Sequence, residues 1–225
     1  MKTDAQLKAD VTRELQWDPS VDAAHVGVAA QDGVVTLTGH LATFAEKHAV
    51  ERAVQRVEGV KAIAIELDVR LDPRHRRSDT EIAAAAEAAL GWSVEVPADR
   101  IRVQVEKGWV TLDGEIDWEF QRRSAEKLVR ALTGVVGVTN HIRLRPVVAP
   151  ANISHRIREA LSRHAEREAG HIEVTVAGST VTLRGRVGSW AERRAAQGAA
   201  WSAPGISLVV NELAVGGLGP RPPLD

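Results

Sequence analysis

Short runs in which apolar and polar residues alternate occur in pairs, and three such pairs are spread along the chain. The second run of each pair is rich in Val and Thr and reaches a glycine, at Gly39, Gly114 and Gly185. Alternating β-branched residues favour strands, so each pair predicts a β-hairpin whose second strand ends at its glycine. The expected turns are Gln31-Asp32-Gly33, Glu106-Lys107-Gly108 and Ala177-Gly178-Ser179, and the third has its glycine one position earlier.

Apolar residues at helical spacing stand before and after each hairpin. The helices before the hairpins are marked by Leu7, Val11, Leu15; Ile82, Ala86, Leu90; and Ile153, Ile157, Leu161. The first two begin with capping-box patterns, Thr3 with Gln6 and Ser78 with Glu81. The helices after the hairpins carry Ala49, Val50, Ala53, Val54; Ala125, Leu128, Val129; and Ala195, Ala196, Ala199, Ala200.

A second set of glycines and a last alternating run complete each unit. Gly59, Gly134 and Gly205 lie twenty residues after the first set, where the second helix is expected to end in a left-handed residue. The last strands include Asn140 and Asn211, which share the phase of the apolar residues around them. We therefore expect both asparagines to be half-buried and hydrogen-bonded to nearby backbone.

The repeat sets the domain organisation. We predict an α+β protein of three tandem αββαβ modules, each a three-stranded mixed sheet with two helices on one face. The modules cover residues 1–72, 78–146 and 150–217, and residues 218–225 form a flexible tail. Modules of this size have small cores, so support from neighbouring modules is expected.

Composition narrows the possible functions. The formal net charge is −1 and there is no cysteine, so neither a general attraction to nucleic acid nor thiol chemistry is expected. An amphipathic helix begins at the start of the sequence without an apolar signal region, and no apolar run reaches the length of a membrane span. We therefore expect a soluble, cytoplasmic protein.

Charge is distributed unevenly. Lys and Arg minus Asp and Glu give −4 for residues 1–72, −2 for 78–146 and +2 for 147–217. In the third module, Arg156, Arg163 and Arg167 fall within about 40° on a helical wheel. These arginines and Trp190 are our candidates for contact with anionic lipid. The alternative is an ordinary solvated face, partly neutralised by glutamates.

The sequence contains six tryptophans and no tyrosine. We expect Trp17, Trp92 and Trp201 to pack in the cores and Trp109 to lie on the outer face of its sheet. Trp118 and Trp190 stand at the starts of the second helices, where either core packing or a membrane or partner surface is consistent with the sequence.

Catalytic and metal-binding patterns are missing from the sequence. The eight histidines never pair at i, i+4, and no Ser/His/Asp set recurs between modules. A repeat that preserves only apolar and glycine positions is typical of a scaffold. We predict no enzyme activity, no cofactor, no metal and no small-molecule substrate, and we expect no nucleic-acid partner.

The repeated pattern resembles the BON domain family. The resemblance rests on the αββαβ order, the Val-Thr-Leu-x-Gly strand, the glycine twenty residues on, and the ending Gly-Val-x-x-Val-x-Asn-x-Leu. It covers residues 4–70, 79–145 and 151–215; the first copy departs from it by having Ile65 in place of the asparagine.

The resemblance implies a non-enzymatic module that binds phospholipid membranes or other envelope components, often in osmotic or envelope stress. Many relatives are exported, whereas this sequence shows no export signal. Two hypotheses follow: a module that associates with lipid surfaces, or a soluble scaffold that binds another protein or another copy of itself.

Overall fold

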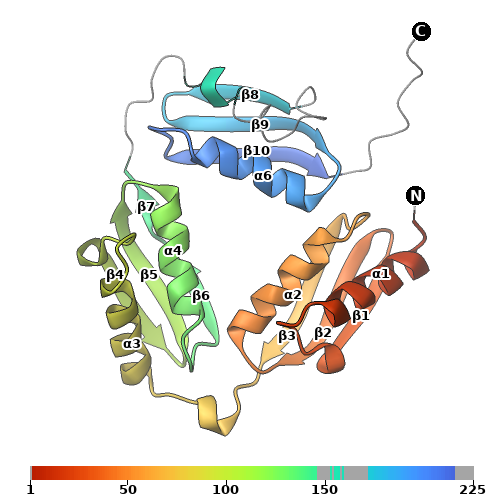
Figure 1. Cartoon of the computed structure of the whole chain (residues 1–225), viewed down its shortest axis with the longest axis horizontal. Coiled ribbons are helices and arrows are strands. Elements are labelled where there is room, and N and C mark those ends of the chain that lie inside the picture. Colours follow the sequence, from red (N-terminus) through yellow and green to blue (C-terminus); the bar gives the residue numbers. More distant parts are fainter. Residues whose placement is uncertain (1, 146–152, 154, 158, 160–171, 216–225) are drawn as a thin grey trace.

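The computed structural model describes residues 2–145, 153, 155–157, 159 and 172–215, and it confirms the prediction of three tandem αββαβ modules (Figure 1). Module 1 contains α1 (Asp4–Trp17), η1 (Ala23–His25), β1 (Val26–Gln31), β2 (Val34–Leu41), α2 (Phe44–Arg56) and β3 (Ala62–Val69). The short helix η2 (Pro73–His75) lies in the linker to module 2.

The second and third modules repeat this order. Module 2 contains α3 (Asp79–Gly91), η3 (Ala98–Arg100), β4 (Ile101–Glu106), β5 (Trp109–Ile116), α4 (Glu119–Arg130), β6 (Gly137–Asn140) and β7 (Arg143–Leu144). Module 3 contains helical residues at 153, 155–157 and 159, then β8 (Ile172–Ala177), β9 (Thr180–Val187), α6 (Trp190–Trp201) and β10 (Leu208–Val215).

Each sheet is mixed, with the hairpin strands antiparallel and the last strand parallel to the second one. The strand orders are β1-β2-β3, β4-β5-β6 and β10-β9-β8. In module 2 the last strand is interrupted, and its two parts, β6 and β7, both pair with β5 in parallel. The parallel return requires a crossover connection, and the second helix of each module supplies it.

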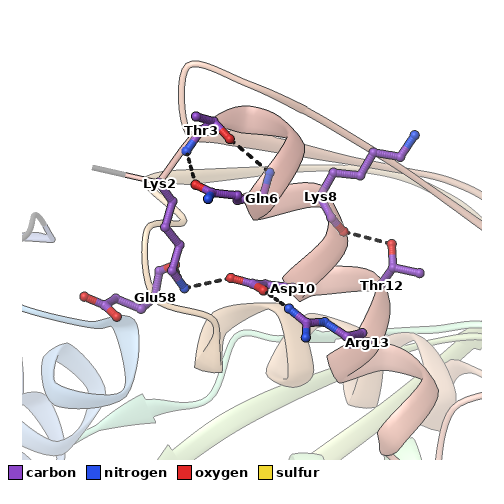
Figure 2. Close-up of polar contacts among 8 residues, drawn as sticks. All are labelled: Lys2, Thr3, Gln6, Lys8, Asp10, Thr12, Arg13 and Glu58. Atoms are coloured by element: carbon purple, nitrogen blue, oxygen red, sulfur yellow. Dashed lines mark hydrogen bonds and ion pairs between the residues drawn. The ribbon is translucent and has the colours of Figure 1, made fainter.

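Polar contacts of side chains around the start of α1 fix the residue at which this helix begins (Figure 2). The Thr3 side chain accepts a hydrogen bond from the Gln6 backbone, and the Gln6 side chain accepts one from the Thr3 backbone at 2.9 Å, which confirms the capping box. One turn further, Asp10 forms ion pairs with Lys2 and Arg13. Hydrogen bonds from Lys2 and then Arg13 lower the pKa of Asp10.

The hairpin turns of modules 1 and 2 are held by the first helix. Asp4 accepts from the backbone N–H groups of Asp32 and Gly33 at 3.0 and 3.3 Å, and Asp79 accepts from the equivalent Lys107 and Gly108 at 2.8 Å each. Both central residues of these turns have positive φ, as in a type I′ turn. In module 3 only the first central residue, Gly178, does (φ 59°), so the shifted glycine gives a different turn.

The cores contain the predicted apolar stripes. Leu7, Val11 and Leu15 are buried, as are Ile82, Ala86 and Leu90, and all six are on the helix faces that meet the sheets. The buried cores of modules 2 and 3 are continuous, whereas module 1 has a separate core onto which Trp190 of module 3 packs. Within the described ranges, no helix is long and apolar enough to cross a membrane.

Two expectations about glycine are wrong. The second strands of the hairpins do not end at their glycines, because β2 continues beyond Gly39 to Leu41 and remains paired with β3 as far as Val69. Gly39 has φ 123°, and a Cβ there would lie 2.0 Å from the His25 carbonyl oxygen, so a close backbone approach requires the glycine. The second helices, in turn, reach their C-caps at Val57, Ala131 and Ser202, two or three residues before the glycines that close the following turns.

Two of the three tryptophans expected in the cores are exposed. Trp17 and Trp92 have 84% and 90% of their surface exposed, whereas Trp201 is buried. Trp17 ends α1 and Trp92 caps α3, and each lies two residues beyond the last buried residue of its helix. At about 100° per residue, that offset turns the ring well away from the core. Trp109 lies on the outer sheet face, as predicted, with its Nε1 2.8 Å from Thr139 Oγ1.

The three modules lie around a common centre, and α2, α4 and α6 face it (Figure 1). Contacts join modules that are far apart in sequence. Trp190 Nε1 donates to the Val60 carbonyl at 2.9 Å, and Arg194 donates to Gln55 Oε1 at 2.6 Å, so the first half of α6 meets the end of α2. The Arg122 guanidinium, near the start of α4, lies 5.4 Å from the centre of the Trp201 ring at the end of α6.

Candidate functional site

The arginine stripe proposed for lipid contact lies only partly in the described structure. Arg156 is described and exposed, whereas Arg163 and Arg167 lie outside the described residues. The stripe therefore stays a prediction. The fourth candidate, Trp190, has another role in this structure: its ring is partly buried against the core of module 1, and Arg193 lies 5.2 Å above the ring centre.

The two asparagines connect the last strand to the second helix. Asn140 Nδ2 donates to the Arg122 carbonyl at 3.2 Å and to Glu126 Oε2 at 3.1 Å, and its Oδ1 accepts from Ile142 N–H at 3.2 Å. Asn211 makes the same three contacts in module 3. All the polar groups of both side chains are occupied by neighbours from their own module, so neither asparagine is available for a ligand.

The six repeated glycines have backbone roles. Positive φ angles occur at all of them: Gly39, Gly114, Gly185, Gly59, Gly134 and Gly205. At Gly134, for example, φ is 96° and a Cβ would lie 2.8 Å from the Arg77 side chain. None of these contacts points to an anion-binding turn.

The structure has an exposed apolar surface that the sequence did not predict as a whole, although Trp118 was left open between a core and a surface position. We call this surface the apolar rim. It consists of Trp92, Val94, Trp118 and Phe120. Trp92 and Val94 are almost completely exposed, and the two other side chains are exposed by nearly half. A sequence signal was present, because Trp92 follows a capped helix stripe out of phase, but Trp118 and Phe120 belong to a different segment of the chain.

Local contacts bring these residues to one end of module 2. The loop after α3 is tied to α4 by a 2.6 Å hydrogen bond from Ser124 to Glu95. The same end is closed by a 2.9 Å ion pair between Arg100, just before β4, and Asp117, just after β5. An exposed Trp and Val on a loop, with two partly exposed aromatic side chains at the same end of the module, form a surface that is typical of an interaction site.

The first residue of each second helix differs in chemistry between the modules. It is Phe44 in α2, Glu119 in α4 and Trp190 in α6. Phe44 packs against the shared core of modules 2 and 3, and Trp190 packs against that of module 1. Glu119 is buried, and its Oε2 lies 2.7 Å from Arg122 Nε. Burial raises the pKa of Glu119, and the nearby Arg122 opposes that rise.

A cavity of about 480 Å³ lies where modules 1 and 3 meet. Its lining includes Lys2, Leu7, Val60, Lys61 and Val215. Both lysines already have partners: Lys2 pairs with Asp10 at 2.9 Å, and Lys61 donates to the Asp32 carbonyl at 3.0 Å. The two lysines that line the cavity are therefore already ion-paired or hydrogen-bonded, and they offer little to a charged ligand.

Side chains suited to a metal do not gather in the described part of the chain: no three His, Asp or Glu residues there are placed to hold an ion. Three arginines come from three different second helices: Arg52 of α2, Arg130 of α4 and Arg194 of α6. Burial lowers the pKa of Arg130 and of Arg194, and the charge of Arg52 lowers both further.

Comparison with known proteins finds a curated relative and solved structures, among them two of CdsD. Over 147 residues the chain is 26% identical to "Osmotically-inducible protein Y" of Escherichia coli (strain K12), which covers 63% of this chain and 73% of that protein. A solved structure of CdsD, a structural protein of the type III secretion system of Chlamydia trachomatis, is 17% identical to this chain, with a TM-score of 0.25. The match covers 95% of this chain and 94% of the CdsD chain. The C-terminal domain of CdsD is also 17% identical, with a TM-score of 0.26 and coverage of 95% and 99%.

The family assignment follows from the repeat itself. The model of the BON domain matches residues 3–70, 78–146 and 150–217, which together are most of the chain. Those three segments contain the three αββαβ modules described above. The chain therefore belongs to the BON domain family, as three tandem copies of the domain.

Proposed function

We propose that this protein is a non-enzymatic binding protein of the BON type that associates weakly with anionic phospholipid surfaces or other envelope components. Its similarity to an osmotically inducible protein supports a role in osmotic or envelope stress. We expect it to act in the cytoplasm. The observation that carries the membrane part of the proposal is the apolar rim of module 2, with Trp92 and Val94 almost fully in solvent.

The chemistry of the rim is suited to the boundary between lipid headgroups and acyl chains. Trp is enriched at that boundary because its ring is apolar but carries a hydrogen-bond donor. Complete burial of a large apolar side chain is worth about 1.5–3 kcal/mol. The rim offers a few such side chains, two of them already half-covered, so the binding it supports is weak and reversible.

Charge supplies the preference for anionic lipid in this proposal. Module 3 has a net charge of +2 over residues 147–217, and Arg156 is exposed. Each basic residue close to an anionic bilayer contributes about 1 kcal/mol, and this contribution weakens as salt is added. The predicted stripe of Arg156, Arg163 and Arg167 would add to the apolar contribution of the rim.

Flotation with phosphatidylglycerol vesicles and with phosphatidylcholine vesicles tests the proposal. We expect the full chain to float with the former at low salt, and we expect the double variant Trp92→Ser, Phe120→Ser to lose most of that association. Trp17→Ser is the matched control. Trp17 is similarly exposed at the equivalent position of module 1, but it does not belong to the apolar rim, which lies on module 2. Wild-type protein that stays at the bottom of the gradient, or a control that loses as much as the double variant, would refute the membrane role.

A protein scaffold is the second candidate, and the contacts between modules favour it. In two of three modules the aromatic residue that starts the second helix, Phe44 or Trp190, packs against another module. Trp118 and Phe120 flank the same position in module 2 and remain exposed. The rim could thus receive another BON surface. A concentration-dependent dimer by analytical ultracentrifugation, abolished by the rim double variant and accompanied by no flotation, would support this candidate instead.

A further inference from the structure

The outer face of the module 2 sheet carries a tryptophan whose ring is fixed in place. The helices of the module pack on the opposite face, where Val110 and Leu112 are buried, and Trp109 of β5 is 48% exposed. Gly137 lies opposite Trp109 in β6, and a Cβ there would overlap the six-membered ring of the indole. The indole Nε1 donates to Thr139 Oγ1 at 2.8 Å. The ring therefore lies along β6 and is held at both ends.

This arrangement occurs in module 2 alone among the three sheets. The residues in register with Trp109, Gly137 and Thr139 are Val34, Ala62 and Ala64 in module 1, and Thr180, Leu208 and Val210 in module 3. The backbone of Gly137 does not have a positive φ that would require glycine, so the absence of its side chain makes room for the ring. Residues of two strands thus combine to hold a half-exposed aromatic surface in one orientation.

An open groove of about 370 Å³ lies beside the ring and has a mostly polar lining. Besides Trp109, the lining consists of Gln104, Glu106, Lys107, Thr111 and Val136. Four of these five side chains are polar, and no hydrogen bond or ion pair to another described residue occupies any of the four. A volume of this size is within the range of small-molecule sites, which begins at about 300 Å³.

The charges in the groove are balanced. Glu106 and Lys107 carry opposite charges, whereas Gln104 and Thr111 are neutral and can each donate and accept hydrogen bonds. Phosphate groups would require an excess of positive charge, so the lining suits a neutral ligand with several hydroxyl groups. The exposed indole face is apolar and carries the negative side of the ring quadrupole, which attracts weakly positive C–H groups.

We propose that this groove binds a pyranose ring of a neutral carbohydrate. A pyranose has a face of C–H groups, which stacks on the exposed face of Trp109, and a rim of hydroxyl groups, which exchange hydrogen bonds with Gln104 and Thr111. Because Thr139 already accepts from the indole N–H, the ring binds the sugar through its face alone. Its fixed orientation reduces the conformational entropy that is lost on binding.

The proposed carbohydrate site is separate from the apolar rim. Trp109 begins β5, whereas Trp118 of the rim follows the end of that strand at Ile116. At about 3.3 Å per residue, roughly 23 Å of strand separates the two ends. The carbohydrate proposal therefore does not rest on membrane association, and each can fail without the other.

Nuclear magnetic resonance with ¹⁵N-labelled full-length protein tests the site. The probes are cellotriose, maltotriose and triacetylchitotriose. We expect the indole N–H signal of Trp109, identified by its absence in Trp109→Phe, to shift saturably with at least one of these sugars. Trp109→Ala, which shortens a half-exposed side chain, should abolish binding of that sugar.

Gly137→Ala is the sharper variant, because it keeps every side chain of the groove and displaces only the ring. We expect at least about tenfold weaker binding, a loss of about 1.4 kcal/mol. Module 1 has Ala62 at the equivalent position, so the strand accommodates alanine. Trp17→Ala is the control, since Trp17 is exposed but lies on another module away from the groove, and it should bind as wild type.

Three results would overturn the proposal. One is a wild-type protein whose Trp109 signal shifts with none of the three sugars. Another is equal sugar binding by wild type, Trp109→Ala and Gly137→Ala, which would place the sugar elsewhere. The last concerns the class of ligand: if oligothymidylate shifts the Trp109 signal saturably and the sugars do not, the ring stacks on nucleobases and the site belongs to a nucleic acid.

Discussion

At the scale of single residues, the asparagine of the last strand shows how a polar side chain can be part of a small core. Asn140 is half-buried and satisfies its amide with a backbone carbonyl, a carboxylate and a backbone N–H. Module 1 has Ile65 instead, which packs against the core of that module. A polar bridge and an apolar contact thus serve the same position, since each leaves no buried group unsatisfied.

Removing the amide of Asn140 should destabilise module 2. Asn140→Ala leaves the Ile142 N–H without its partner and removes two contacts to α4, so we expect a loss of about 1–3 kcal/mol in unfolding free energy by chemical denaturation. Arg143→Ala, an exposed change on the same strand, should be close to neutral. An equal loss in the two variants would mean that the amide contacts contribute nothing specific.

At the scale of elements, the two helices of module 1 are held together by ion pairs between side chains as well as by their apolar faces. Arg56 at the end of α2 reaches Glu14 and Asp18 at the end of α1. Hydrogen bonds from Ser20 and from Arg56 lower the pKa of Asp18 to about 2, from 3.8. Because the folded protein holds this carboxylate ionised, the stabilisation is present above pH 3.8 and is lost as the pH falls toward 2.

Arg56→Gln should therefore lower stability in a pH-dependent way. Near neutral pH we expect a loss of about 0.2–1 kcal/mol, the range for partly exposed ion pairs. The difference from wild type should shrink as Asp18 becomes protonated below pH 3.8. Thermal denaturation across this range measures it, with Arg102→Gln, which forms no ion pair within the described residues, as the control. A difference that does not change with pH would contradict the ionic origin.

At the scale of the whole molecule, three similar modules meet through the same parts of their second helices. The start of α6 meets the end of α2, and the start of α4 meets the end of α6. Phe44 at the start of α2 packs against the shared core of modules 2 and 3. Such head-to-tail contacts can close into a ring when the rotation between units allows it, and here a single chain supplies all three units.

Loss of one of these contacts should loosen the arrangement without unfolding the modules. Trp190→Ala removes the hydrogen bond to Val60 and a partly buried ring. We expect a larger radius of gyration by small-angle X-ray scattering, together with an unchanged far-ultraviolet circular dichroism spectrum. Trp17→Ala, which changes an exposed ring, should leave both unchanged. If Trp190→Ala is as compact as wild type, the contact does not hold modules 1 and 3 together.

Much of the fold could be predicted because each module is built from local periodicity. The period of the apolar residues marks helices and strands, and capping residues such as Thr3 and Ser78 mark helix starts. The candidate functional site was harder to predict from the sequence. The predicted arginine stripe follows one helix, whereas the apolar rim combines residues from two separate segments of module 2.

The sequence by itself determined the repeat, the αββαβ order, the buried stripes and the membership of the BON domain family, since all of these depend on spacing along the chain. The tertiary structure decided which side chains were left uncovered and which charges were brought together. Trp92 and Trp201 differ little as residues in a sequence, yet one is 90% exposed and the other is buried beneath Arg122 of another module. Burial and charge neutralisation depend on what packs opposite a residue, and that partner can come from anywhere in the chain.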